Sequence, residues 1–182
     1  MSFTKQMNRN IEIKARVPNA ARFSAMIERA EGLADNGPTV IHQDDTFFNC
    51  QHGRLKLRKF SESDGELIYY DRPDSIEPEE SQYIVSPTAT PDSLRQALSL
   101  SLGIRGSVRK RRVLYLVGQT RIHFDDVEDL GKFIEREVML QPEQNRTEGV
   151  RIANDLMSNL GIEKTSLVDK AYIDLLVERD GY

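Results

Sequence analysis

Polar side chains at every second position give several short segments of this sequence one face that could do chemistry. In "NIEIKARV", residues 10–17, apolar and polar residues alternate, as they do in a β-strand whose two faces differ. The polar positions of this segment are Asn10, Glu12, Lys14 and Arg16. Carboxylates and basic groups can hold a metal ion and an anion if other strands turn similar faces toward the same space.

The same alternation recurs in further segments, each with aliphatic or aromatic residues on the opposite face. The aligned polar residues are Arg54, Lys56 and Arg58 in 54–58; Arg72 in 68–72; either Arg109 with Arg111 or Lys110 with Arg112 in 108–115; Arg121, His123 and Asp125 in 121–125; and Glu135 with Glu137 in 133–138. Lysines and arginines therefore concentrate on a few expected strands.

Two arrangements explain these polar faces. In an open sheet they face water, and the clustering is a coincidence. In a closed barrel of about eight strands they line an interior with room for a small ligand. Packed basic groups repel one another, so such an interior requires an anion. Four carboxylates would then supply oxygen ligands for Mg²⁺ or Mn²⁺, which together with the basic groups describes a polyphosphate site. They are Glu12, Asp125, Glu135 and Glu137.

Length and composition predict one soluble globular domain over residues 1–182. Charged residues make up 30% of the chain and hydrophobic ones 38%. The net charge of −4 argues against a general nucleic-acid partner, whereas the basic runs "GRLKLRK" and "VRKRR" favour a specific anion. The longest apolar run, "VLYLV", is too short to cross a membrane, and "MSFTKQMNRN" lacks the apolar stretch of a signal peptide. We therefore expect a cytoplasmic protein with no membrane partner.

Cysteine and histidine contribute little to the expected site. The single cysteine, Cys50, excludes an intrachain disulfide and a cysteine-rich zinc site, and we expect a packed thiol. The three histidines lack the spacing of a histidine-based zinc site, which leaves oxygen ligands. We interpret His42 and His52 as structural. For His123 we favour a hydrogen-bonded position in the lining over a general base.

The order of expected elements favours an α+β fold with an antiparallel sheet, because most strand connections are too short for parallel crossovers. Expected helices follow Asn19 up to Gly32, run from Thr90 to Gly103, and cover 142–160 and 166–179. Expected strands lie at 41–49, 54–60, 66–72, 81–87, 107–117, 120–127 and 133–140, with an exposed loop at 74–81.

Five motifs, in this order, resemble those of a known family. They are "NIEIK" (10–14), similar to E-x-E-x-K; "QDDTFF" (43–48), similar to Q-x-D-T-Y-F; "RLKLR" (54–58), similar to L-R-x-R; "VRKRR" (108–112), similar to K-x-R; and "HFDDVEDLGKFIEREV" (123–138), similar to D-x-V-x-x-L-G-x-F-x-E-x-E. The helix with Tyr172 is similar to an S-Y-x-x-L element. The chain thus resembles, over roughly residues 8–176, the CYTH superfamily of class IV adenylyl cyclases, thiamine triphosphatases and related triphosphate tunnel metalloenzymes. The likeness is closest to bacterial adenylyl-cyclase-like proteins.

The resemblance implies a closed eight-stranded antiparallel barrel with flanking helices, holding a triphosphate and one or two Mg²⁺ or Mn²⁺ ions. The implied metal ligands are Glu12, Asp125, Glu135 and Glu137; the implied triphosphate ligands are Lys14, Arg16, Lys56, Arg58, Arg72, Lys110, Arg112 and Arg121; and the implied catalytic residues are Glu12, Lys14 and Glu137. The assignments of Arg16, Arg72 and Arg121 as triphosphate ligands are based mainly on strand alternation. An alternative for Asp125 is to cap the turn that follows it.

Two residues depart from the family pattern. Asn10 stands where the first signature Glu is expected, and its amide oxygen can bind a metal without adding charge, which affects metal affinity or number. Arg136 replaces the usual apolar residue between the two glutamates. Its position lies outside the expected tunnel, so we expect an effect on packing or on an interface.

Three functions fit a barrel that binds a triphosphate. The first is a phosphohydrolase, in which water attacks a terminal phosphorus of tripolyphosphate or of a nucleoside or thiamine triphosphate. The second is an adenylyl cyclase, in which the ribose 3′-hydroxyl of ATP attacks the α-phosphorus and releases pyrophosphate. The third is a module that binds polyphosphate or nucleotide without turnover. A scaffold with an ordinary solvated sheet is the remaining alternative, and a homodimer is possible by the same resemblance.

Overall fold

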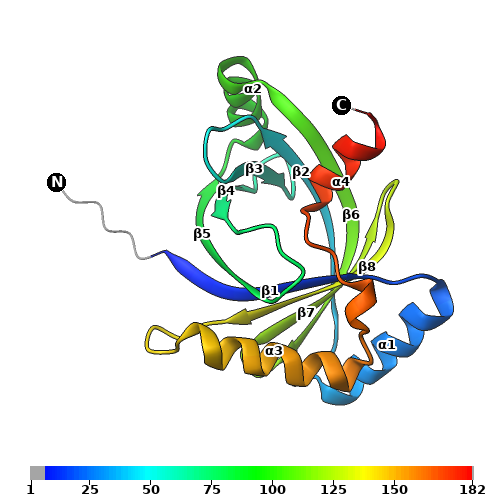
Figure 1. The fold of residues 1–182 in the computed structure, drawn as a ribbon. Coiled ribbons are helices and arrows are strands. Elements are labelled where there is room, and N and C mark those ends of the chain that lie inside the picture. Colours follow the sequence, from blue (N-terminus) through cyan, green and yellow to red (C-terminus); the bar gives the residue numbers. More distant parts are fainter. Residues whose placement is uncertain (1–6, 182) are drawn as a thin grey trace.

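The structure, a computed structural model, describes residues 7–181 and contains a closed antiparallel barrel in that range (Figure 1). The strands are β1 (Asn8–Arg16), β2 (Thr39–Phe48), β3 (Arg54–Lys59), β4 (Gly65–Asp71), β5 (Glu79–Thr88), β6 (Ile104–Val117), β7 (Thr120–Val127) and β8 (Gly131–Met139). They pair in the order β1-β5-β4-β3-β2-β6-β7-β8, and β8 pairs back with β1. The expected α+β fold with a closed eight-stranded barrel is confirmed.

Four α-helices and one short 3₁₀ turn surround the barrel within the described range. They are α1 (Ala20–Leu33), α2 (Pro91–Leu102), α3 (Arg146–Leu160), η1 (Lys164–Ser166) and α4 (Tyr172–Arg179). Figure 1 shows α1 and α3 beneath β1, β7 and β8, with α2 at the opposite end. Asn19 caps α1 as expected, accepting a hydrogen bond from the Arg22 amide at 2.8 Å.

The apolar strand faces pack outward under the helices. Phe124, between His123 and Asp125, is fully buried, and Ile134 beside Glu135 is 1% exposed. Both join a core cluster with Leu160 of α3. Burying each such side chain contributes about 1.5–3 kcal/mol, and side chains alternate along a strand, so this outer core turns the neighbouring polar side chains inward.

Two helices begin later than the sequence predicts. The last helix begins at Tyr172 and not at 166, because the chain before it runs along the end of β1. Ala15 forms a β-bridge with Leu167, and the Val168 amide donates to the Lys14 carbonyl at 2.9 Å. These contacts hold the segment extended. The third helix begins at 146 and not at 142, where Asn145 forms a capping box with Glu148.

Expectations for two single residues have different outcomes. The prediction of a packed thiol is wrong, since Cys50 is exposed and its Sγ donates to the Gly53 carbonyl at 3.4 Å. Arg136 does lie outside the cavity lining and packs under α3, with 1% exposure. Its Nη1 donates to the Ala153 carbonyl at 2.6 Å, so its effect is on packing.

The ends of the chain bear on two further expectations. Most of the polar N-terminal stretch that argued against a signal peptide, residues 1–6, lies outside the described residues. Within residues 7–181, none of the helices has the length and apolar character needed to cross a membrane.

Candidate active site

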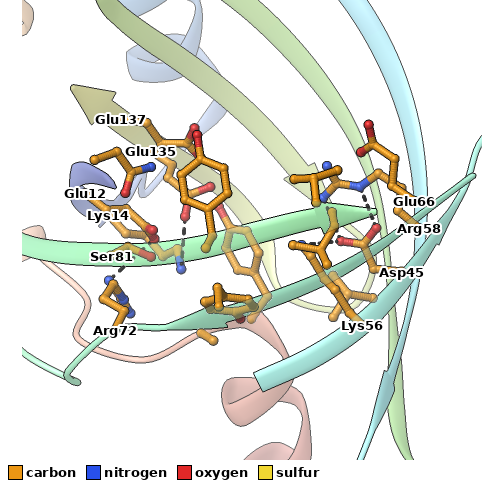
Figure 2. A pocket seen from close by; sticks show the side chains of 18 of the residues that line it. Glu12, Lys14, Asp45, Lys56, Arg58, Glu66, Arg72, Ser81, Glu135 and Glu137 are labelled. Carbon is orange, nitrogen blue, oxygen red and sulfur yellow. Dashed lines mark hydrogen bonds and ion pairs between the residues drawn. The ribbon is translucent and has the colours of Figure 1, made fainter. Parts of the chain in front are cut away.

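The barrel encloses a cavity of about 370 Å³ lined by the inward faces of its strands. Most of the polar residues predicted from strand alternation meet there. The predicted residues that line it are Glu12, Lys14, Lys56, Arg58, Arg72, Lys110, Arg112, Arg121, Glu135 and Glu137. The open, solvated sheet is therefore excluded. Figure 2 shows two groups of these side chains, one around Glu12, Glu135 and Glu137, the other around Asp45.

The second group is a buried ion-pair cluster at Asp45. Its carboxylate accepts hydrogen bonds from Lys56 Nζ at 2.8 Å, from Arg58 Nε at 2.7 Å and from Arg58 Nη2 at 2.8 Å. Burial alone would raise the pKa of the Asp45 carboxyl, but Lys56 and Arg58 hold it well below its usual range. Asp45 thus neutralises the two basic side chains that the sequence assigned to the triphosphate.

Sequence reasoning missed Asp45, although a signal was available. It lies within the "QDDTFF" motif, and it has the same strand parity as Phe47, which also lines the cavity. The motif was matched to the family without a role for its aspartate. The pairing could not be read from β2 alone, because the register that sets Asp45 opposite Arg58 belongs to the β2–β3 ladder.

Asp125 forms a second buried cluster and does not line the cavity. It is 0% exposed. Its two oxygens accept hydrogen bonds from Lys110 Nζ at 3.1 Å, from Arg112 at 2.7 and 2.6 Å, and from the Tyr172 hydroxyl at 2.9 Å. A carboxylate offers about four lone-pair positions, so little capacity remains for a metal ion.

Among the described residues, the partners of the Asp125 carboxylate are Lys110, Arg112 and Tyr172, and not the turn that follows β7. Asp125 holds Lys110 and Arg112, two of the basic side chains that line the cavity, in place. Burial and then Arg112 lower the pKa of Lys110 to about 8.

The first group in Figure 2 brings together carboxylates from β1 and β8. Glu12 lies opposite Glu137 in the β1–β8 ladder, and Lys14 lies opposite Glu135. Burial raises the pKa of Glu12 to about 7, a shift that Arg72, 3.5 Å away, opposes. Burial would also raise the pKa of Glu135, but Lys14 Nζ at 3.3 Å and other donors hold it well below its usual range.

His123 lies next to these carboxylates and is 3% exposed. Its Nδ1 is 3.8 Å from Glu135 Oε2 and 3.7 Å from Glu137 Oε1, which is too long for a hydrogen bond. This nitrogen has no hydrogen-bond partner among the described residues. Burial and then Arg112 lower the pKa of His123, which favours the neutral imidazole. The prediction of a hydrogen-bonded position in the lining is therefore wrong, since in the described part of the chain His123 is not among the residues that line the cavity and its Nδ1 has no hydrogen-bond partner.

Asn10, the first departure from the family pattern, also lines the cavity. It is 4% exposed, and its Oδ1 has no hydrogen-bond partner among the described residues. A buried amide oxygen without a partner is unfavourable by about 1–3 kcal/mol, so it is available to a ligand, as the sequence argument assumed.

Arg16, like Asp125 and His123, does not line the cavity. It is exposed, its Nη1 donates to the Leu130 carbonyl at 2.7 Å, and its guanidinium lies 4.6 Å from the Phe133 ring centroid. Phe133 pairs with Arg16 across β1 and β8 and packs against Tyr172, with ring centroids 5.0 Å apart. Because these rings fill the interior at that level, Arg16 lies outside it.

The lining also has apolar positions that the sequence argument did not single out. They are Phe47, Ile68, Val85 and Val108, joined by Tyr70 and Tyr83. Arg109 and Arg111, in contrast, are exposed on the outer face of β6. The cavity thus combines basic groups, a carboxylate cluster and an apolar wall.

The barrel is closed, and its cationic and carboxylate side chains face one cavity, the architecture of a barrel that binds an anion and a metal ion. Comparison with known protein families agrees with this architecture. The family model of the CYTH domain matches residues 8–172. The chain belongs to the CYTH domain family. No curated protein sequence matches it.

Solved structures show the same fold. The PH1012 protein from Pyrococcus horikoshii OT3 is 26% identical, with a TM-score of 0.79, covering 91% of this chain and 98% of its own. A protein from Vibrio parahaemolyticus, described as a candidate adenylate cyclase, is 17% identical with a TM-score of 0.69, covering 94% and 99%. HpAC1 from Hippeastrum, whose structure is described as revealing a dominant triphosphatase activity, is 16% identical with a TM-score of 0.59, covering 96% of each chain.

Proposed function

We propose that this protein is a divalent-metal-dependent phosphohydrolase that acts on a triphosphate bound in the barrel cavity. The carrying observation is that basic side chains from separate strands surround one space next to a carboxylate cluster. The basic residues are Lys14, Lys56, Arg58, Arg72, Lys110, Arg112 and Arg121. Charge-assisted hydrogen bonds from such groups suit phosphate oxygens.

The carboxylate cluster fits a hard divalent cation. Glu12, Glu135 and Glu137 supply oxygen donors, which Mg²⁺ and Mn²⁺ both accept. The raised pKa of Glu12 reflects burial and the nearby charge of Glu135, so a bound cation would relieve unfavourable charge crowding. Such an ion, when bound, polarises the phosphoryl group that is transferred.

The chain's own residues then orient the substrate. Lys14 is 3% exposed, and its ammonium lies 4.2 Å from the Tyr172 ring centroid, so its position is fixed before substrate arrives. A water molecule attacks the terminal phosphorus, its oxygen–phosphorus bond forms, and the bridging P–O bond breaks. The water proton is lost to solvent, and orthophosphate and the shortened diphosphate leave. The fixed cations stabilise the charge on the phosphoryl oxygens.

Hydrolysis is favoured over cyclisation because it requires only the phosphate contacts. The similarity to HpAC1, described as having a dominant triphosphatase activity, supports this choice. The apolar wall formed by Phe47, Ile68 and Val85 could cover an organic group, so ATP and thiamine triphosphate are candidate substrates beside tripolyphosphate.

Product analysis tests the proposal. The purified protein is incubated with tripolyphosphate, ATP or thiamine triphosphate, each with Mg²⁺ or Mn²⁺, and the products are resolved by ion exchange. Orthophosphate as the main product supports the proposal. Cyclic AMP with pyrophosphate as the main products would replace it with the cyclase, and tight binding without product would replace it with the binding module.

Substitution of Glu137 tests the carboxylate cluster. Because Glu137→Gln keeps the shape and removes the charge, we expect metal-dependent turnover to fall by at least about 10–100-fold, the loss that follows removal of a supporting group at a metal site. Glu62→Gln, in the exposed turn between β3 and β4, is the matched control and should keep wild-type turnover. Equal turnover in the two variants would contradict the assignment.

A further inference from the structure

His123 faces the carboxylate cluster from β7 and has no part in the phosphohydrolase described above. Its imidazole is buried beside Glu135 and Glu137, which come from the neighbouring strand β8. Three side chains on two adjacent strands therefore converge at one point of the barrel wall.

The distances suit a shared ion. One ligand atom from each of the three residues can be chosen so that all lie within 4.8 Å of one another. His123 Nδ1 is 3.7 Å from Glu137 Oε1 and 3.8 Å from Glu135 Oε2. Donors bound to one ion at about 2.1 Å lie about 3.0–3.6 Å apart, so side-chain shifts of up to about 1 Å would complete the site.

The unpartnered nitrogen is an independent sign of a ligand. His123 is 3% exposed, and its Nδ1 makes no hydrogen bond within residues 7–181. Leaving a buried polar atom without a partner is unfavourable by about 1–3 kcal/mol. The nitrogen points toward two carboxylates, which are the usual companions of imidazole in a mixed nitrogen and oxygen metal site.

We propose that His123 is a metal ligand through Nδ1, together with Glu135 and Glu137, and that this nitrogen makes the site prefer Co²⁺ and Mn²⁺ to Mg²⁺. The inference deepens the proposed function, since it concerns the metal ion of that same cavity. Mg²⁺ is a hard ion that takes oxygen ligands, whereas imidazole nitrogen suits the transition metals. Among these, the affinity of a given site rises from Mn²⁺ to Co²⁺.

The first experiment uses the wild-type chain without substrate. Mn²⁺ is bound to the protein, and electron spin echo spectroscopy is used to look for coupling to a directly bound ¹⁴N nucleus. A ¹⁴N coupling supports the inference. Its absence, with Mn²⁺ stoichiometrically bound, overturns it, and this outcome does not depend on any variant folding.

The second experiment removes the imidazole. Calorimetric titrations with Co²⁺, Mn²⁺ and Mg²⁺ are compared between the wild type, His123→Gln and the matched control His42→Gln, an exposed histidine on β2. In His123→Gln we expect Co²⁺ affinity to fall about 10–100-fold and Mg²⁺ affinity to change by less than about threefold. The ¹⁴N coupling should disappear there and persist in the control.

Three outcomes of this comparison overturn the inference: equal losses for Co²⁺ and Mg²⁺, no loss for either, or a ¹⁴N coupling that survives in His123→Gln. Far-ultraviolet circular dichroism checks that the variant is folded. The proposed function fails differently, by the absence of triphosphate hydrolysis with every metal tested, so the two results are separable.

Discussion

The ion-pair cluster at Asp45 leads to the sharpest prediction, which concerns Asp45→Asn. In the wild type, Asp45 is 2% exposed and joins Lys56 and Arg58, whose side chains are 14% and 13% exposed. The substitution keeps one acceptor oxygen and the side-chain shape but removes the charge. Two largely buried cations then face each other without a counter-charge.

The magnitude follows from this geometry. Breaking a buried ion pair by removing one partner lowers stability by about 3–5 kcal/mol, and the remaining amide oxygen favours the lower end, about 3 kcal/mol. With a urea dependence of about 2 kcal/mol per molar, the unfolding midpoint should fall by about 1.5 M.

An anion should restore more stability in the variant than in the wild type. Phosphate oxygens compete with Asp45 for Lys56 and Arg58 in the wild type, whereas in Asp45→Asn both cations are free to bind them. The rise in unfolding free energy on adding tripolyphosphate should therefore be larger in the variant by at least about 1 kcal/mol.

The assay is urea unfolding at pH 7, with and without tripolyphosphate. The difference between wild type and variant should shrink as the pH falls below about 4, because a carboxyl with a lowered native pKa stabilises the fold only while it stays ionised. Asp44→Asn is the matched control, since Asp44 has a 43% exposed side chain and should change stability by less than about 0.5 kcal/mol. The reasoning is refuted if Asp45→Asn behaves like this control, or if the anion stabilises both proteins equally.

Two further predictions concern other buried cations. Burial lowers the pKa of Arg136 to about 9, and its charge has no carboxylate partner among the described residues, so Arg136→Met should raise the free energy of unfolding by about 1–4 kcal/mol. A measured decrease would show that the hydrogen bond to Ala153 outweighs the desolvation. Since the pKa of Lys110 is lowered to about 8, tripolyphosphate affinity should fall up to about tenfold between pH 7 and pH 9. Calorimetry should show a smaller fall in Lys110→Arg, which stays charged, and an equal fall would contradict the role of Lys110.

Local sequence pattern predicted the inner face of most strands. Lys56 and Arg58 alternate with Leu55 and Leu57, and Glu135 and Glu137 alternate with Ile134 and Val138. The period of a strand is two, so once the apolar set is buried under helices, the polar set must face the other side. The order of elements likewise predicted the antiparallel connections, and the family motifs predicted the closed barrel.

Local pattern could not predict which polar groups pair with one another. Asp45 meets Arg58 through the register of β2 with β3, and Asp125 meets Tyr172 of the last helix, 47 positions further along the chain. Arg16 has the parity of a lining residue, yet Phe133 and Tyr172 occupy the interior at its level. Such outcomes depend on residues far apart in the sequence.

The sequence alone determined the fold class, the family and the identity of most inward side chains, because these depend on periodicity and short motifs. Only the tertiary structure decided that Asp125 is saturated with donors, that Asp45 neutralises part of the basic lining, and that His123 keeps an unpartnered nitrogen beside two glutamates. The physical reason is that ionisation, hydrogen bonding and metal affinity depend on burial and on distances between strands, which closure of the barrel sets.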